Sequence, residues 1–245
     1  MPVRVRFMLA ERGTVADLER LAGHGFYFDL KVDGIRAMVE LSGARHPAPR
    51  VAMHSRNDLD LTRRFPELVE ALESLDERAL VLDAEIAVRA SDGMPSWPLT
   101  QRRTAQSTPS ASLVKELPAS LFVFDVLTLG RDDTTGLTFQ RRRDLLEQLA
   151  DEWPSPLTLT PCTRDVSAIW DFVGTHHLEG VIAKAPLSRY RPGRSSDWVK
   201  VKAVQSLTCL VGGVQWAGAE GLGALRSLHL YLVGESGELV PVGKA

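Results

Sequence analysis

The segment FYFDLKVDGIRAMVEL at residues 26–41 constrains the fold more than any other part of the sequence. Two apolar, strand-like runs flank a short polar turn that contains Asp33 and Gly34. The segment therefore predicts a strand, a turn and a second strand, with Lys31 just before the turn and Arg36 just after it.

The rest of the chain mixes strand-like and helix-like segments without a regular βαβ rhythm, which indicates an α+β fold with largely antiparallel sheets. Residues 61–75 carry apolar side chains at helical spacing. Residues 91–112 are polar and contain prolines, so we expect them to be rich in loops. The three arginines at 141–143 are predicted to form a solvated helix start. Further strands are predicted over residues 51–54, 79–89, 121–129, 180–185 and 198–203, and further helices over 140–149 and 166–173. The basic stretch 188–196 is predicted as a loop.

The chain changes character after residue 203. Strands are predicted over residues 207–214, 227–233 and 238–242, separated by Gly-rich turns and with no helix between them. We therefore expect two domains, residues 1–203 and a partial β-barrel over residues 204–245. Three strands cannot close a barrel, so this barrel is expected to be incomplete or to be completed by a partner.

Composition and charge exclude several classes of protein. No run approaches the ~20 apolar residues of a membrane span, and the first residues lack a secretory signal. The two cysteines form neither a disulfide framework nor a zinc spacing, so we expect a cytoplasmic protein. A net charge of −2 argues against a surface that is positive all over, but a local basic stripe could still bind nucleic acid.

The motif KVDGIR at residues 31–36 combines a lysine, a flexible turn and a following cation. A lysine attacks phosphorus only as the free amine, so a nucleophilic Lys31 needs burial or nearby cations that disfavour its ammonium form. Lys200 and Lys202 would be such cations if the fold brings them close. A lysine beside an Asp-Gly turn is more often part of a surface ion pair, so this motif alone does not establish a nucleophile.

Further motifs follow in order: SRNDLDLTRRFPEL at 55–68, LDAEIAV at 82–88, FVFDVL at 122–127, EGVIAK at 179–184 and DWVKVK at 197–202. With KVDGIR, this series resembles the bacterial ATP-dependent DNA ligases, within the covalent nucleotidyltransferases that include RNA ligases and mRNA capping enzymes. The resemblance covers residues 5–204. It implies an α+β, ATP-grasp-like nucleotidyltransferase domain with mainly antiparallel sheets over residues 1–203, followed by the start of an OB-fold β-barrel over residues 204–245.

The resemblance also implies roles for individual residues. Lys31 would attack the α-phosphate of ATP and hold AMP, which then passes to a DNA 5′-phosphate for nick or end sealing. Arg36 and Arg56 would contact the ribose and the phosphates, and Phe124 would stack on adenine. The lysines that would stabilise phosphate charge as pyrophosphate leaves are Lys184, Lys200 and Lys202.

Two carboxylates complete the implied site. Glu85 would reach the ribose hydroxyl or a metal-bound water, and Glu179 would hold Mg²⁺ or Mn²⁺ through hard oxygen ligands. A carboxylate inside an apolar strand is hard to explain structurally, because a buried unpaired charge is costly. Asp29 stands where the family usually has Glu, close to the adenine edge, which leaves base selection open.

The implied partner is nicked or broken double-stranded DNA, bound by a monomeric enzyme that acts at the bacterial nucleoid. Candidates for contact with DNA phosphates without base readout are Arg102, Arg103, Arg191 and Arg194.

Two other functions stay open at this point. One is an RNA ligase or a capping-type nucleotidyltransferase, although SRNDLDLTRRFPEL and the extended WVKVK strand favour a DNA ligase. The other is a catalytically impaired nucleotide- or DNA-binding module, because the family continues into a barrel whose last basic motif orients pyrophosphate. Residues 204–245 contain only the first strands expected of that barrel.

Overall fold

The computed structural model describes residues 6–43, 50–75, 79–203, 208–217, 224–234 and 236–245. The chain divides into two compact units, Met1–Ala203 and Val204–Ala245. Residues 204–207 lie outside the described residues. The first residue of the expected second domain and the start of the strand expected from residue 207 therefore also lie outside them.

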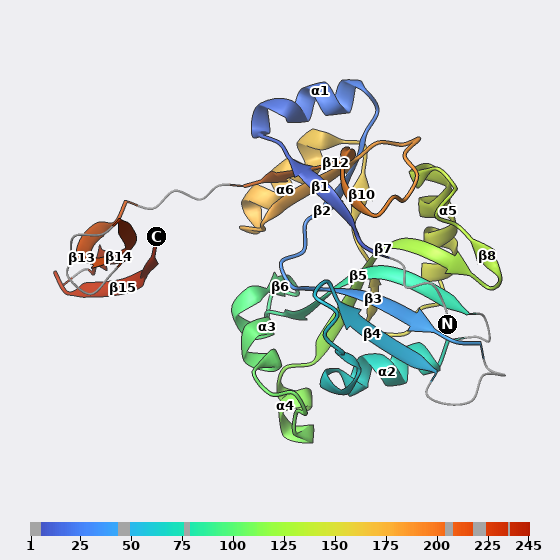
Figure 1. Cartoon of the computed structure of the whole chain (residues 1–245), viewed down its shortest axis with the longest axis horizontal. Helices are drawn as coiled ribbons and strands as arrows, with labels where there is room; N and C mark the ends of the chain where they lie inside the picture. Colours follow the sequence, from blue (N-terminus) through green and yellow to red (C-terminus); the bar gives the residue numbers. More distant parts are fainter. Residues whose placement is uncertain (1–5, 44–49, 76–78, 204–207, 218–223, 235) are drawn as a thin grey trace. The chain divides into compact units, whose positions relative to one another are not determined.

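One sheet of the larger unit joins strands from both ends of that unit (Figure 1). Its order is β1 (Met8–Arg12), β12 (Gly193–Lys202), β11 (Gly180–Lys184), β2 (Tyr27–Leu30) and β10 (Cys162–Thr163). The pair β1–β12 is parallel, and the other described pairs are antiparallel. The helices α1 (Leu18–Gly23) and α6 (Val166–Thr175) share an apolar core with this sheet that includes Leu21, Phe28, Ile169, Val181 and Val201.

The second sheet of the larger unit has the order β4 (Val51–Ser55), β3 (Ile35–Leu41), β5 (Leu80–Arg89), β7 (Ala119–Leu129) and β8 (Asp132–Asp133). β6 (Pro95–Ser96) pairs with β5, and β9 (Leu157–Leu159) pairs with β7. α2 (Pro66–Glu73) and α5 (Phe139–Ala150) pack on this sheet around Phe65, Leu68, Leu72 and Leu146. The remaining helices are α3 (Trp97–Thr104), α4 (Ala111–Glu116) and the 3-10 turns η1 (Val15–Asp17) and η2 (Thr62–Arg64).

The predicted α+β class with mainly antiparallel sheets is confirmed. The two strands predicted on either side of the KVDGIR turn are present as β2 and β3, but they belong to different sheets. The segment that carries Lys31 therefore crosses from one sheet to the other.

Several segments differ from the sequence-based expectation. Residues 91–112 are not all loop, because α3 begins at Trp97 with Pro98 in its first turn, where proline is tolerated. β12 begins at Gly193, inside the expected basic loop, because its first residues pair with β1. β1 and α1 were not predicted, since a strand of five residues and a helix of six carry little periodic signal.

The arginines at the start of α5 are not all solvated, as the sequence had suggested. Arg142 is fully buried, and its Nε and Nη2 donate to the two carboxylate oxygens of Asp125 at 2.7 and 2.9 Å. Arg142 Nη1 also donates to the carbonyl of Leu137 at 2.8 Å. Arg141 instead exposes 76% of its side chain. This fork-to-fork pair ties α5 to the middle of β7.

We expect Arg142→Ala to lower the free energy of unfolding by about 3–5 kcal/mol, because it leaves the carboxylate of Asp125 buried without its cation. The neighbouring Arg141→Ala variant is the matched control and should change it by less than about 0.5 kcal/mol. Urea denaturation of both variants measures the difference. Equal effects would show that the Arg142–Asp125 pair does not stabilise this unit.

The smaller unit contains one antiparallel sheet in the order β13 (Leu210–Trp216), β14 (Leu225–Val233) and β15 (Leu239–Lys244). These are three strands at the predicted places, with shifted ends, and the residues described here contain no helix. Several large apolar side chains of this sheet are exposed, including Leu210, Val211, Trp216, Val233 and Leu239. In the described parts of both units, no helix is long and apolar enough to cross a membrane.

Candidate functional site

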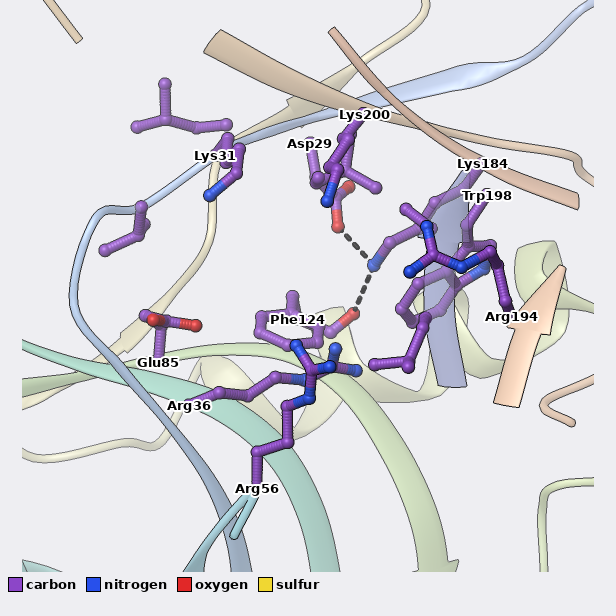
Figure 2. A pocket seen from close by; sticks show the side chains of 15 residues that line it. Asp29, Lys31, Arg36, Arg56, Glu85, Phe124, Lys184, Arg194, Trp198 and Lys200 are labelled. Atoms are coloured by element: carbon purple, nitrogen blue, oxygen red, sulfur yellow. Dashed lines mark hydrogen bonds and ion pairs between the residues drawn. The ribbon is translucent and has the colours of Figure 1, made fainter. Parts of the chain in front are cut away.

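A pocket of about 230 Å³ in the larger unit is lined by side chains from both of its sheets (Figure 2). Residues of β1, β2, β11 and β12 contribute from one sheet, and residues of β3, β5 and β7 contribute from the other. The lining includes eight residues that the sequence analysis singled out for nucleotide chemistry: Asp29, Lys31, Arg36, Arg56, Glu85, Phe124, Lys184 and Lys200.

Strand pairing explains why residues far apart in sequence meet here. In one sheet, Ile182 of β11 is the direct partner of both Asp29 on β2 and Lys200 on β12. In the other sheet, Arg36 of β3 lies opposite Glu85 of β5. Direct cross-strand neighbours lie about 4.5–5.5 Å apart, so each pairing places two pocket side chains side by side.

Two glycines of the motifs are required by close backbone approach. A Cβ atom at Gly34 would lie 2.3 Å from the carbonyl oxygen of Ile86, and one at Gly180 would lie 2.1 Å from that of Val201. Gly180 also has φ of +139°, which L-residues with a side chain rarely adopt. The backbone N–H of Lys31 donates to the carbonyl of Gly180 at 2.9 Å. Gly34 therefore lets the KVDGIR turn approach β5, and Gly180 lets the EGVIAK segment approach β12.

Glu179 connects two of the predicted lysines. Its Oε2 accepts a short hydrogen bond from Lys31 Nζ, and its Oε1 lies 2.7 Å from Lys202 Nζ. Burial alone would raise the pKa of Glu179, but the hydrogen bonds from Lys202 and Lys31 lower it below its ordinary value. Glu179 is therefore an ionised carboxylate that holds Lys31 at the edge of the pocket.

Two further carboxyl groups lie close to Glu179. Burial raises the pKa of Glu85 to about 8, although Arg36 and Lys31 act in the opposite direction, and Glu179 adds to the increase. Burial and the charge of Glu179 also raise the pKa of Asp33. The negative charge of Glu179 therefore disfavours the ionised forms of both neighbouring carboxyl groups.

Lys184 lies apart from Lys31, on the other side of the pocket (Figure 2). Its Nζ is 2.5 Å from Asp29 Oδ2 and 3.3 Å from the carbonyl oxygen of Phe124, and the side chains of Lys184 and Asp29 are 1% and 2% exposed. The rings of Phe124, Phe139 and Trp198 lie 4.3 to 4.8 Å from the same Nζ. The charge of Lys184 is thus matched by Asp29 at the aromatic end of the pocket.

Arg36 is fixed by a buried network that sequence reasoning missed. Its Nε and Nη2 donate to the two oxygens of Asp83 at 2.9 and 2.6 Å. The hydroxyl of Tyr190 donates to Asp83 at 2.6 Å and accepts from the backbone N–H of Met8 at 3.0 Å. Burial alone would lower the pKa of Arg36, but Asp83 raises it above its ordinary value. The network joins β3 and β5 of one sheet to β1 of the other.

The aromatic rings of Phe7, Phe124 and Trp198 surround the guanidinium of Arg36, with its central carbon 5.0, 5.3 and 5.8 Å from the three ring centroids. Asp83 and Trp198 could have been found from the sequence, because each lies inside a motif that was already singled out. Tyr190 lies between motifs, and no pattern marked it.

We expect Tyr190→Phe to weaken the binding of AMP several-fold, because Asp83 loses the hydroxyl that orients it and Arg36 is then held less firmly. Tyr27→Phe is the matched control, since the hydroxyl of Tyr27 accepts only an exposed bond from Arg164 among the interactions described. Calorimetric titration measures the affinity of each variant for AMP. Equal affinity in Tyr190→Phe and the wild type would show that the hydroxyl does not position the site.

The arginines predicted to contact DNA fall into different environments. Arg103 is fully buried and its Nη2 donates to both oxygens of Glu67, so the prediction of a DNA contact at Arg103 is wrong. Helical spacing turns the adjacent Arg102 outward, where it pairs with Glu116 and leaves 58% of its side chain exposed. Arg191 is exposed, and Arg194 lines the pocket.

Two mainly antiparallel sheets that enclose a pocket with a lysine, carboxylates, arginines and an aromatic ring are the architecture of an ATP-dependent nucleotidyltransferase. Residues 7–202 match the family model of the ATP dependent DNA ligase domain, and the chain belongs to this family. The resemblance stated from the motifs is therefore confirmed.

Relatives from mycobacteria support the same assignment. The chain is 33% identical over 224 residues to DNA ligase C of Mycobacterium tuberculosis, covering 88% of this chain and 60% of that protein. It is 37% identical over 225 residues to DNA ligase C2 of Mycolicibacterium smegmatis, covering 89% of this chain and 61% of that protein. The chain thus spans about 60% of the length of these relatives.

Solved structures of similar fold are also ligases. A structure described as mycobacterial DNA ligase D complexed with ATP and MES has a TM-score of 0.69 and 30% identity, covering 98% of this chain and 71% of that one. The ligase domain of Mycobacterium tuberculosis LigD has a TM-score of 0.67 and 32% identity, covering 98% and 72%.

Proposed function

We propose that this chain is the catalytic core of an ATP-dependent DNA ligase, in which Lys31 accepts AMP and transfers it to a DNA 5′-phosphate. The observation that carries the proposal is the position of Lys31 in one pocket with Phe124, Arg36 and Lys200. An aromatic ring, cations and a lysine are the groups needed to bind an adenine nucleotide and attack its phosphate. Family membership and the mycobacterial relatives favour this function over an RNA ligase or a capping enzyme.

The first step forms a bond between Lys31 Nζ and the α-phosphorus as the bond from that phosphorus to the β-phosphate oxygen breaks. Lys31 first loses its ammonium proton to solvent to become the nucleophilic amine. Pyrophosphate then leaves with the electron pair of the broken bond, and the nitrogen releases a second proton to solvent as the phosphoramidate forms. Glu179 holds the ammonium form of Lys31 until the nucleotide is bound. Lys200 and Lys202 would stabilise the charge that develops on the phosphate.

The residues also fit a divalent cation, Mg²⁺ or Mn²⁺. Such ions are commonly held by one or two carboxylates together with substrate phosphates. Glu179 and Glu85 would supply two such carboxylates and the substrate phosphates the other ligands, since within the described residues no group of three or more metal-binding side chains gathers. The bound cation would neutralise phosphate charge. Asp29 and Arg56 both line the pocket. In this proposal Asp29 would accept from the amino group at the adenine edge, and Arg56 would contact the phosphates.

The division of labour between the two units is part of the same proposal. Residues 1–203 would form the adenylation domain. The sheet β13–β15 would be the first part of an OB-fold barrel that follows it. Nicked or broken double-stranded DNA is the proposed substrate, at the bacterial nucleoid.

Lys31→Ala is expected to abolish covalent AMP transfer to the chain. Intact mass spectrometry after incubation with Mg²⁺ and ATP should show a gain of one AMP in the wild type and none in the variant, with GTP giving no gain in either. Lys115→Ala, an exposed lysine on α4, is the matched control and should gain AMP normally. AMP on Lys31→Ala would remove Lys31 from the mechanism, and no AMP on the wild type would contradict self-adenylylation by this chain.

Arg191→Ala should weaken the binding of nicked DNA and reduce the slope of log affinity against log salt concentration by about one, because one phosphate contact is lost. Arg141→Ala, an exposed arginine on α5, should keep the wild-type slope. Fluorescence anisotropy across a salt series measures both slopes. An unchanged slope in Arg191→Ala would show that Arg191 does not contact a DNA phosphate.

A further inference from the structure

A second pocket of the larger unit lies on the face of the second sheet that is turned away from the nucleotide pocket. It has a volume of about 660 Å³, and its lining includes Leu80 at the start of β5 and Leu129 at the end of β7. Side chains alternate between the two faces of a strand, so Leu80 shares a face with Leu82, whereas Glu85 lines the nucleotide pocket. A molecule bound in the second pocket would therefore leave the nucleotide pocket free.

We call this second pocket the α5 groove, because Leu145 and Leu149 of α5 and Trp153 just after it contribute to its lining. These three side chains, together with Leu75 and Leu129, pack against the main apolar core and are still partly exposed. Apolar side chains that gather in one concavity and remain open to solvent are typical of binding sites. The groove therefore fits a molecule that brings apolar side chains of its own.

The α5 groove is flanked by acidic side chains. Glu152 lines it, Asp151 is the neighbour of Glu152, and Glu73 precedes the lining residue Ser74. All three carboxylates are exposed, and within the described ranges of the chain none of them forms an ion pair. Arg50 donates to the main-chain carbonyl of Glu73 and so caps α2.

The end of α5 adds to the negative potential beside Asp151 and Glu152. A helix carries partial negative charge at its C-terminus, and basic residues in the last turn usually offset it. The last turn of α5 contains no basic residue. The groove thus combines an apolar floor with a negative border, which favours a partner that is apolar and cationic.

We propose that the α5 groove docks a peptide segment of another protein that carries large apolar side chains next to lysine or arginine. The apolar side chains would pack on Leu149 and Trp153, and the cations would pair with Asp151 and Glu152. Exposed ion pairs contribute little affinity, so apolar burial holds the segment and the carboxylates select its charge. DNA, a polyanion, has the wrong charge for this border. Because the nucleotide pocket stays free, the groove suits a partner that recruits the chain without blocking it.

Binding of two designed peptides to the full chain tests the docking site. Each labelled peptide has roughly 12 residues with leucines at i, i+3, i+4 and i+7, and carries either lysines or glutamates beside them. Fluorescence anisotropy should give a Kd in the micromolar range for the lysine peptide, at least about tenfold lower than for the glutamate peptide. Asp151→Lys with Glu152→Lys should abolish or reverse this preference.

A matched control separates local charge from net charge. Glu19→Lys with Asp171→Lys reverses two exposed carboxylates on α1 and α6 and should keep the wild-type preference. Leu149→Asn should weaken binding of the lysine peptide about tenfold, because an apolar contact is lost. The charge reversals lie at exposed positions, so they decide the matter even where thermal melting shows that Leu149→Asn does not fold.

Several results would overturn the docking site. Equal affinity of the wild type for both peptides, no binding of either, or a preference that survives the reversal at Asp151 and Glu152 would each do so. Displacement of the lysine peptide by nicked DNA would assign the groove to DNA. Self-association in sedimentation runs that the same reversal abolishes would assign it to a second copy of the chain. None of these measurements needs AMP transfer to Lys31, so the docking site and the proposed function are tested separately.

Discussion

The ion pair between Arg36 and Asp83 is the interaction on which the rest of the site depends. Asp83 is fully buried, so its charge is tolerable only because Arg36 and the Tyr190 hydroxyl saturate it. Through Tyr190 and Met8, the same carboxylate connects strands of both sheets. The two walls of the pocket are therefore held together by one satisfied polar network, packed beside the rings of Phe124 and Trp198.

The sequence predicted the parts of the site that local pattern determines. Alternation along β12 placed Lys200 and Lys202 correctly as strand residues, and a charge inside an apolar strand correctly drew attention to Glu85. The pocket shows that these segments converge, because each of the six motifs contributes at least one residue to its lining. What the sequence could not give was the register of strands that are distant in the chain.

The arginines show this limit most clearly. Arg102 and Arg103 are chemically identical neighbours, yet one is in solvent and the other is buried against Glu67, which lies more than thirty residues earlier in the chain. Arg141 and Arg142 differ in the same way: Arg141 is exposed, whereas Arg142 is buried because it pairs with Asp125 of β7. An ion-pair partner that is brought close by tertiary packing cannot be recognised from the neighbouring sequence. Clusters of arginines in the sequence therefore overestimate how much basic surface is exposed.

The shared carboxylate of Glu179 links the chemical state of Lys31 to the electrostatics of the whole site. A lysine nitrogen bonded to AMP is no longer an ammonium, so Glu179 would keep Lys202 as its partner and lose Lys31. One carboxylate oxygen would thus become available at the moment when the nucleotide is activated. The loaded and unloaded forms of the chain would differ in local charge as well as in mass, and an incoming strand end could distinguish them by that difference.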